Sequence, residues 1–226
     1  MKMDSKYRAI GLDMDGTLLD THVDYVEMAN LVFDQMVRMG VPENVIKRKD
    51  GFKFNLESGT KYLIEQKRGD EIPMIHEKIT KAARDIEMQN LEEARPFPGT
   101  VETLKRFREK KYGIGVLTRG CREYADAALE FCGVSHLIDA VIARDDYSEK
   151  EAKPSPIAML HLAEKLDVKP EEILYVGDHA FDYRCAHDSG AGFIGVLSGV
   201  FDIDDWHRID KNITVIDSVH DLYFID

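Results

Sequence analysis

The sequence predicts an α/β fold in which a parallel sheet is interrupted by an all-helical insertion. From residue 100 onward, short apolar runs typical of buried strands alternate with amphipathic helical patterns. This alternation is the pattern of right-handed crossovers in a parallel sheet that is covered on both faces. Residues 20–94 carry helical spacing without a convincing strand, and residues 95–100 hold two prolines and a glycine that mark a boundary. We therefore expect a core of residues 1–19 and 95–226 and an insertion of residues 20–94.

The composition describes a chain that can bury a sizeable core and that lacks the charge pattern of a nucleic-acid-binding or membrane-docking protein. Its 226 residues are 44% hydrophobic and 32% charged, with a formal net charge of −12. No basic tract is present to neutralise phosphates or to attract an anionic membrane, and no apolar run approaches the ~20 residues of a membrane span. Three cysteines without a CxxC spacing, and an amino terminus without the apolar segment of a secretory signal, predict a cytoplasmic protein.

The amino-terminal part begins with one strand and continues as helices. Residues 7–12 form a short apolar run typical of a buried strand, and Gly16 lies in the turn after it. The polar, basic stretch of residues 47–53 contains a glycine and predicts a loop. Three segments space their apolar side chains as helices do: residues 26–37, 56–68 and 73–86.

Beyond the boundary at residues 95–100, the predicted strands and helices alternate. The apolar runs that predict strands are residues 113–117, 137–143, 173–176, 193–197 and 213–216. The amphipathic patterns that predict helices are residues 101–110, 122–131, 156–166 and 181–187, followed by a helical turn near the end. Together with residues 7–12, these segments predict one parallel sheet.

Two carboxylates follow the first predicted strand. Asp13 and Asp15 are two residues apart, so on an extended backbone they point to the same side. Two close carboxylates repel each other, and one is normally protonated unless a cation lies beside them. This stretch alone is equally compatible with a metal site that includes a carboxylate nucleophile and with a polar turn at the end of a strand.

Other strand ends supply further polar groups to the same edge of the predicted sheet, where ligands of open parallel sheets bind. Thr118 follows residues 113–117, Lys153 precedes the helix at residue 156, and Asp178 follows residues 173–176. Phosphoryl transfer needs these groups, because catalysis is mainly positioning and neutralisation of charge on the phosphoryl oxygens. A hydroxyl and an ammonium can bind those oxygens, and a hard divalent cation such as Mg²⁺ removes the repulsion between a carboxylate nucleophile and the phosphoryl group.

Four segments carry a family resemblance. Residues 13–17 match DxDGT, Thr118 ends a hydrophobic strand, residues 153–156 match KPxP and residues 177–182 match GDxxxD. In this order they resemble the four motifs of the haloacid dehalogenase-like (HAD) superfamily, and the helical insertion is similar to a C1-type cap. The resemblance spans nearly the whole chain. It implies a Rossmann-like parallel core and an enzyme that looks like a phosphoglycolate phosphatase.

The resemblance also implies roles for the matched carboxylates. Asp13 would be the nucleophile that forms an aspartyl-phosphate, and Asp15 would be the general acid and then the general base. Mg²⁺ would be held by an Asp13 carboxylate oxygen, the Asp15 backbone carbonyl and the Asp178 side chain, while Asp182 would orient the site from behind these ligands. Haloacid dehalogenases lack an acid at the position of Asp15, so phosphatase activity is favoured over dehalogenation.

The residues expected to bind phosphate are Thr118, Lys153 and Arg119. Arg119 departs from the family pattern, because related members with a C1 cap often carry Asn directly after the Thr of the second motif. Its guanidinium has two interpretations: a contact to a phosphate or carboxylate of the substrate, or an ion pair directed away from the site.

The function predicted from these residues is a Mg²⁺-dependent phosphomonoester hydrolase. Its expected partner is a small phosphorylated metabolite, with no nucleic acid and no membrane, and the chain is expected to be a monomer or a homodimer. A phosphosugar mutase similar to β-phosphoglucomutase would use the same motifs and differ only in which hydroxyl receives the phosphoryl group. A non-enzymatic receiver-like module that keeps a phospho-aspartate is disfavoured, because Asp15 suits turnover.

Overall fold

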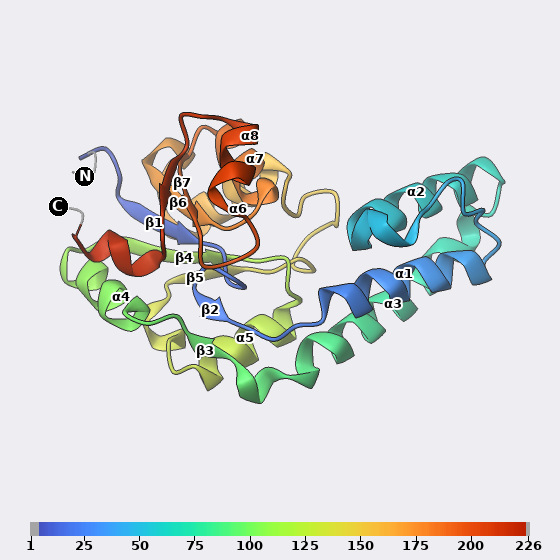
Figure 1. The fold of residues 1–226 in the computed structure, drawn as a ribbon, viewed down its shortest axis with the longest axis horizontal. Coiled ribbons are helices and arrows are strands. Elements are labelled where there is room, and N and C mark those ends of the chain that lie inside the picture. The colour runs from blue at the N-terminus through green and yellow to red at the C-terminus, as the bar shows by residue number, and fades with distance from the viewer. Residues whose placement is uncertain (1–4, 225–226) are drawn as a thin grey trace. The chain divides into compact units, whose positions relative to one another are not determined.

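The computed structural model describes residues 5–224. The chain divides into two compact units (Figure 1). Unit 1 comprises residues 1–21 and 92–226, and unit 2 comprises residues 22–91. Within the described residues, no helix combines the length and the apolar character needed to cross a membrane.

Unit 1 is built on a six-stranded parallel sheet with the strand order β5-β4-β1-β6-β7-β8. The strands of this sheet are β1 (Ala9–Leu12), β4 (Gly113–Leu117), β5 (Ala140–Ile142), β6 (Ile173–Gly177), β7 (Gly192–Val196) and β8 (Thr214–Ile216). A separate antiparallel pair consists of β2 (Leu19–Asp20) and β3 (Arg95–Pro96). The predicted α/β fold with a parallel sheet is confirmed, and β1 lies at its centre between β4 and β6.

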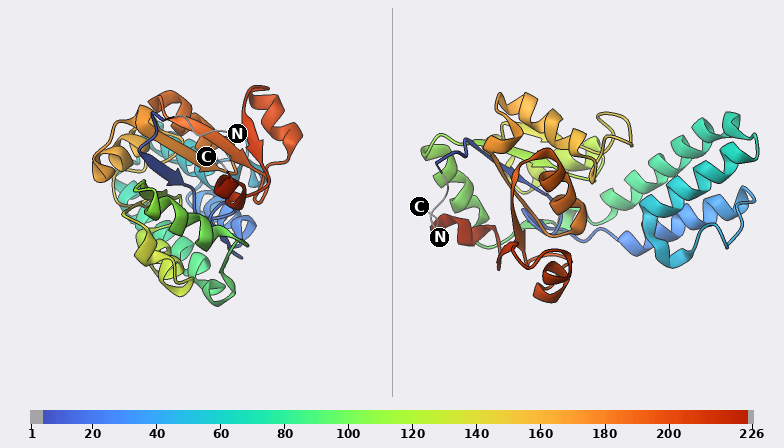
Figure 2. Two further views of the ribbon diagram at one scale, coloured as in Figure 1. Left: turned by 90° about the vertical axis from the view of Figure 1, so that its left-hand side faces the viewer. Right: turned by 90° about the horizontal axis from the view of Figure 1, so that it is seen from above.

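Helices cover both faces of the sheet. In Figure 2, α6 and α7 lie on one face of the sheet and α4 and α5 on the other. The helices of unit 1 are α4 (Thr100–Glu109), α5 (Arg122–Phe131), α6 (Pro156–Leu166), α7 (Ala180–Ser189) and α8 (Ile203–Ile209). Short 3-10 helices are η3 (Leu91–Glu93), which begins in unit 2, η4 (Ser135–Leu137), η5 (Pro170–Glu172) and η6 (Val219–Phe224).

Glycines in two strands allow α6 to pack closely on the sheet. A Cβ on Gly115 of β4 would lie 2.6 Å from a methyl carbon of Leu162, and one on Gly11 of β1 would lie 3.3 Å from the other. Both distances are short for carbon atoms, so side chains here would push the helix outward. Because α6 begins three residues after Lys153, the close packing of this helix helps to fix where Lys153 enters the sheet edge.

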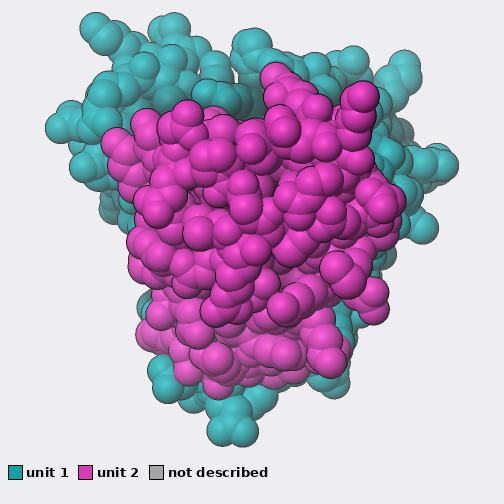
Figure 3. Space-filling model, turned by 90° about the vertical axis from the view of Figure 1, so that its right-hand side faces the viewer, with its two compact units in different colours: residues 1–21, 92–226 teal, residues 22–91 magenta. Residues whose placement is uncertain are grey.

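Unit 2, which is coloured magenta in Figure 3, is a bundle of three helices with a core of its own. Its helices are α1 (Tyr25–Arg38), α2 (Gly51–Glu65) and α3 (Ile72–Gln89), with 3-10 helices η1 (Arg48–Asp50) and η2 (Gly69–Glu71). The buried core side chains come from all three helices and include Val32, Met36, Leu63 and Ile79. Residues 22–91, all of which the structure describes, contain no strand, as expected from the helical spacing.

The structure corrects several element predictions. The segment expected to be a loop, residues 47–53, is a 3-10 turn followed by the start of α2 at Gly51. The helix starts this early because Phe52 packs on the helical core. In addition, the buried side-chain amide of Asn55 accepts from the Lys47 N–H and donates to the Lys47 carbonyl. The strand expected at residues 137–143 is shorter, since residues up to Leu137 form η4. Helix α8 was not predicted.

Candidate active site

The candidate site begins at the carboxyl end of β1, where Asp13 is the first residue after the strand. The backbone N–H of Asp13 donates to the carbonyl of Val176 at 2.9 Å, so the sheet register places Asp13 beside the end of β6. The turn that follows needs Gly16, whose φ of +82° is unfavourable for other residues. A Cβ at Gly16 would also lie 2.6 Å from Asp178 Oδ2. Gly16 therefore allows the turn without displacing a carboxylate.

Lys153 enters this edge from the segment before α6 and is almost fully buried. Its ammonium contacts the Asp13 carboxylate, and it donates to Asp182 Oδ1 at 2.6 Å and to the hydroxyl of Tyr175 at 3.1 Å. Three partners match the three N–H donors of a lysine ammonium. The pKa of Lys153 is raised above its ordinary value: burial lowers it, but the charges of Asp13 and Asp182 outweigh burial. Lys153 is thus a fixed positive charge.

Three buried carboxylates converge beside Lys153. Asp13, Asp178 and Asp182 each offer an oxygen atom, and these three atoms all lie within 4.8 Å of one another. Carboxylate oxygens are the ligands preferred by hard divalent cations such as Mg²⁺. The cluster is able to hold a divalent cation, and the three residues come from two strand ends and the first turn of α7.

The electrostatics of the cluster favour such a cation. Burial raises the pKa of Asp13 well above its ordinary value, and the neighbouring carboxylates of Asp182 and Asp178 add to this, while Lys153 opposes it. Burial, together with Asp182, raises the pKa of Asp178 to about 6. Three carboxylates face one ammonium here, and uncompensated buried negative charge is unfavourable. A divalent cation would balance the excess charge, so the residues present fit a metal ion.

The segment between β7 and α8 holds Asp178 in place. The backbone N–H of Val200 donates to Asp178 Oδ2 at 2.8 Å, and the N–H of Phe201 donates to the Asp178 carbonyl at 3.3 Å. Gly199 lies so close that a Cβ there would overlap the Asp178 carboxylate. The Ser198 hydroxyl donates to the Gly16 carbonyl at 2.8 Å, which joins this segment to the turn after β1.

Asp15 lies outside the cluster of three carboxylates and has different partners. Its Oδ1 accepts hydrogen bonds from the hydroxyls of Tyr124 at 2.7 Å and of Thr21 at 2.8 Å. Its Oδ2 lies 3.4 Å from the hydroxyl oxygen of Thr118. The carboxylate of Asp15 is therefore positioned by hydroxyl groups, whereas Asp13 is positioned by an ammonium.

Thr118 lies buried at the end of β4. Its backbone N–H donates to the carbonyl of Ile142 at 2.9 Å, and its hydroxyl oxygen accepts from the N–H of Gly120 at 2.9 Å. The structure thus brings Thr118 near Asp15, and Lys153 near Asp13. The sequence predicted that both residues reach this edge of the sheet, Thr118 from the end of a strand and Lys153 from the segment before a helix.

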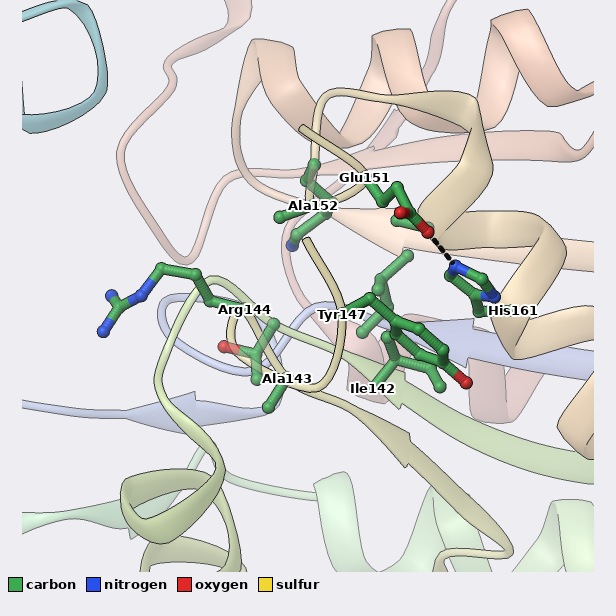
Figure 4. A pocket seen from close by; sticks show the side chains of 11 residues that line it. Ile142, Ala143, Arg144, Tyr147, Glu151, Ala152 and His161 are labelled. Carbon is green, nitrogen blue, oxygen red and sulfur yellow. Dashed lines mark hydrogen bonds and ion pairs between the residues drawn. The ribbon is translucent and has the colours of Figure 1, made fainter. Parts of the chain in front are cut away.

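A pocket extends from Thr118 and Lys153 along the segment between β5 and α6 (Figure 4). The rings of Tyr147 and His161 stack in its wall with 3.6 Å between their centroids. His161 Nε2 lies 2.8 Å from a carboxylate oxygen of Glu151. These contacts hold the chain on either side of Lys153 and form part of its support.

Arg119 lies beside the site, and its guanidinium has partners of its own. It donates to the backbone carbonyl of Lys153 at 2.6 Å and to Glu149 Oε1 at 2.8 Å, with which it forms a partly buried ion pair. Of the two interpretations offered by the sequence, this geometry matches the ion pair. Phosphate binding by Arg119 stays a prediction.

Two aromatic site residues were missed by reasoning from the sequence. Tyr175, in the middle of β6, donates its hydroxyl to the Leu117 carbonyl at 2.9 Å and accepts from Lys153. Tyr124, in the first turn of α5, bonds Asp15. Both aromatic residues match the apolar spacing of their elements, so a core role was the natural interpretation. The one indication of a further role is the hydroxyl itself, because a buried tyrosine hydroxyl requires a hydrogen-bond partner.

Comparisons with known proteins agree with this geometry. The chain is 24% identical to a phosphoglycolate phosphatase of Nitrosospira multiformis over 214 residues, which cover 92% of this chain and 91% of that protein. It is also 24% identical to a phosphoglycolate phosphatase of Haemophilus influenzae over 237 residues, covering 99% and 96% of the two chains.

Solved structures share the fold. A protein from Bacteroides fragilis, provisionally named a haloacid dehalogenase-like hydrolase, superposes with a TM-score of 0.69 at 24% identity, covering 96% of this chain and 99% of its own. A protein from Thermotoga maritima, provisionally named β-phosphoglucomutase, superposes with a TM-score of 0.61 at 21% identity, covering 96% and 97%.

The family itself is shown by the sequence. The model of the family described as haloacid dehalogenase-like hydrolase matches residues 10–196, which contain Asp13, Thr118, Lys153 and Asp178. This chain belongs to the haloacid dehalogenase-like hydrolase family.

Proposed function

We propose that this protein is a Mg²⁺-dependent phosphomonoester hydrolase that acts on a small phosphorylated metabolite through an aspartyl-phosphate on Asp13. The observation that carries the proposal is the buried contact between Asp13 and Lys153 next to the carboxylates of Asp178 and Asp182. The prediction that the chain is a phosphatase is confirmed by the family match and by the relatives named phosphoglycolate phosphatase.

In the proposed first step, an Asp13 carboxylate oxygen attacks phosphorus and the bond to the leaving alcohol oxygen breaks. Lys153 and the Thr118 hydroxyl stabilise the phosphoryl oxygens, while Asp15 donates a proton to the leaving oxygen. Asp15 then takes a proton from the water that hydrolyses the aspartyl-phosphate. A bound Mg²⁺, held by Asp13, Asp178 and the Asp15 backbone carbonyl, would neutralise charge between the nucleophile and the phosphoryl group.

We propose that Asp182 does not bind the metal ion itself but orients residues next to the metal ligands. Both of its carboxylate oxygens already accept hydrogen bonds, Oδ1 from the Lys153 ammonium at 2.6 Å and Oδ2 from the His179 N–H at 3.1 Å. This supports a role in orienting Lys153 rather than in direct metal binding.

The proposed substrate is a small phosphate monoester, and 2-phosphoglycolate is the first to test because relatives carry that name. Unit 2 is the proposed C1-type cap, which would supply substrate specificity. The proposed cytoplasmic location is compatible with the three cysteines, which are all free thiols.

Phosphate release from a panel of phosphomonoesters in the presence of Mg²⁺ tests the proposal. We expect turnover of at least one metabolite, and loss of turnover in Asp13→Asn with an unchanged fold. The same panel includes β-glucose 1-phosphate, and its conversion to the 6-phosphate would instead support the mutase suggested by the Thermotoga maritima neighbour. A protein that releases no phosphate from any of them would contradict the proposed function.

A further inference from the structure

Tyr124 points its hydroxyl into the site from helix α5. Its side chain is only 1% exposed, and its hydroxyl donates to Asp15 Oδ1 at 2.7 Å. The ring lies against the backbone of Gly120, where a Cβ would be 2.8 Å from the Tyr124 ring carbon Cδ1. Because Gly120 follows Thr118 by two residues, the turn after β4 fixes the ring of Tyr124 and the Thr118 hydroxyl together.

The two oxygens of Asp15 are unequally engaged. Oδ1 accepts two short hydrogen bonds, from Tyr124 at 2.7 Å and from Thr21 at 2.8 Å. Oδ2 has a single long contact, 3.4 Å to the Thr118 hydroxyl. A carboxylate oxygen offers about two lone pairs to donors, so Oδ1 is filled. Oδ2 is the oxygen that remains available for a proton.

We propose that Tyr124 is a positioning residue that fixes which oxygen of Asp15 carries the proton. This inference rests on the proposed function, in which Asp15 is the general acid and base. With Oδ1 held by two hydroxyl donors, the proton resides on Oδ2, on the side of Thr118. When the phosphoryl group moves to Asp13, the Oδ2–H proton passes to the leaving oxygen. The Oδ2 lone pair later accepts a proton from the attacking water.

This role makes a chemical prediction that a packing role does not. An alkoxide is a poor leaving group and needs a proton from Asp15, whereas p-nitrophenolate leaves without one. The ratio kcat/KM covers the steps up to the departure of the alcohol, before the aspartyl-phosphate is hydrolysed. A residue that only orients the acid therefore affects kcat/KM for alkyl phosphates and leaves kcat/KM for p-nitrophenyl phosphate nearly unchanged.

The test is Tyr124→Phe, which removes the hydroxyl and keeps the buried ring. It is assayed with p-nitrophenyl phosphate and with the alkyl monoester that the wild-type enzyme hydrolyses fastest, 2-phosphoglycolate being tried first. We expect kcat/KM for the alkyl ester to fall about tenfold, a part of the full contribution of a general acid, with little change for p-nitrophenyl phosphate. In an Asp15→Asn background, Tyr124→Phe is expected to have no further effect.

Tyr183→Phe is the matched control, because Tyr183 also donates its hydroxyl to a carboxylate, that of Asp210 at 3.2 Å, away from Asp15. Folding of each variant is checked by the emission of Trp206, the single tryptophan of the chain, which is buried. Equal losses on both substrates, no loss on either, or a further loss in the Asp15→Asn background would overturn the inference. A wild-type enzyme that hydrolyses no phosphomonoester would instead overturn the proposed function on which it rests.

Discussion

At the scale of single residues, Arg119 is the site residue for which the sequence left two interpretations open, and its observed partners match the ion pair. Its guanidinium joins the Glu149 carboxylate to the Lys153 backbone carbonyl. Lys153 in turn contacts Asp13. This chain of contacts suggests that Arg119 supports the segment that delivers Lys153.

The first prediction concerns Arg119→Met and Glu149→Gln. Each variant is expected to lower the free energy of unfolding by about 1 kcal/mol, because each breaks a partly buried, charge-assisted hydrogen bond. The double variant is expected to lose less than the sum, because both changes break the same pair. Urea unfolding of the four proteins measures these differences.

Arg208→Met serves as the control, since its ion pair with Asp205 involves a largely exposed guanidinium and should contribute little. Inhibition by orthophosphate separates the two interpretations of Arg119. We expect its inhibition constant to be unchanged in Arg119→Met. A rise of about tenfold or more in that variant alone would show a charge-assisted phosphate contact and contradict the supporting role.

The carboxylates and Lys153 were predictable as site candidates, whereas Tyr124 and Tyr175 were not. Asp13 and Asp178 directly follow apolar runs, and the topology of parallel strands brings such positions to one edge. A buried tyrosine looks like any other core aromatic in a sequence, because only the three-dimensional partner of its hydroxyl distinguishes it. The direction of the Arg119 side chain likewise depends on Glu149, thirty residues away along the chain.

Elements were predicted best where local sequence and tertiary packing agree. The bounds of β4, α5 and α6 are those predicted, because each has a clear apolar pattern and a clear end. Helix α8 was missed because its seven residues are mostly polar and its one buried side chain, Trp206, packs on β7 through Gly195. That packing is a tertiary interaction, and no periodicity in so short a segment indicates it.

The segment between β5 and α6 is attached to α5 through Asp146. The Asp146 carboxylate accepts from the Arg122 guanidinium, with 2.9 Å between Nε and Oδ1, and from the N–H of Ala143 at 2.8 Å. Burial raises the pKa of Asp146, but these hydrogen bonds outweigh burial, and the net pKa lies below the ordinary value of 3.8. Asp146 therefore stabilises the fold in its ionised form.

The second prediction is a pH-dependent loss of stability in Asp146→Asn. A carboxyl group whose pKa is lowered by folding stabilises the protein above its unfolded pKa, and this stabilisation is lost as pH falls through the folded pKa. We expect the variant to be less stable than the wild type by about 1 kcal/mol at pH 7, with the difference shrinking below the ordinary pKa of 3.8. Urea unfolding across this pH range measures it.

Asp188→Asn, at an exposed position on α7, is the control and should show a smaller difference at neutral pH. A difference between Asp146→Asn and the wild type that stays constant from pH 7 to below pH 3.8 would contradict the ionic role of Asp146. The lower stability of Asp146→Asn would then reflect only the change in side-chain shape.

At the scale of the whole molecule, the effect of cations on stability depends more on where the negative charges lie than on their total. The chain carries a formal net charge of −12, so any salt stabilises it somewhat by screening. The cluster of Asp13, Asp178 and Asp182 lies entirely in unit 1, whereas unit 2 has a separate hydrophobic core. Screening acts wherever like charges lie close together, whereas a cation bound at the cluster acts on the strand ends that supply Asp13 and Asp178.

The third prediction is that Mg²⁺ slows amide hydrogen exchange at the ends of β1 and β6, and leaves α1, α2 and α3 unchanged at matched ionic strength. A ligand that binds only the folded state stabilises it by about 2.7 kcal/mol at one hundred times its dissociation constant. That free energy acts where the ligand binds, so protection should appear in the strands that supply Asp13 and Asp178. Exchange measured in Mg²⁺ and in NaCl of equal ionic strength separates site binding from screening.

Two variants with the same change of net charge provide the control for this experiment. Asp178→Asn removes a carboxylate of the cluster, whereas Asp204→Asn removes an exposed one from α8. Protection by Mg²⁺ should be lost in Asp178→Asn and kept in Asp204→Asn. Equal protection in both variants, or equal protection of β1 and β6 by Mg²⁺ and by NaCl of the same ionic strength, would mean that Mg²⁺ acts by screening and that the carboxylate cluster is not its site.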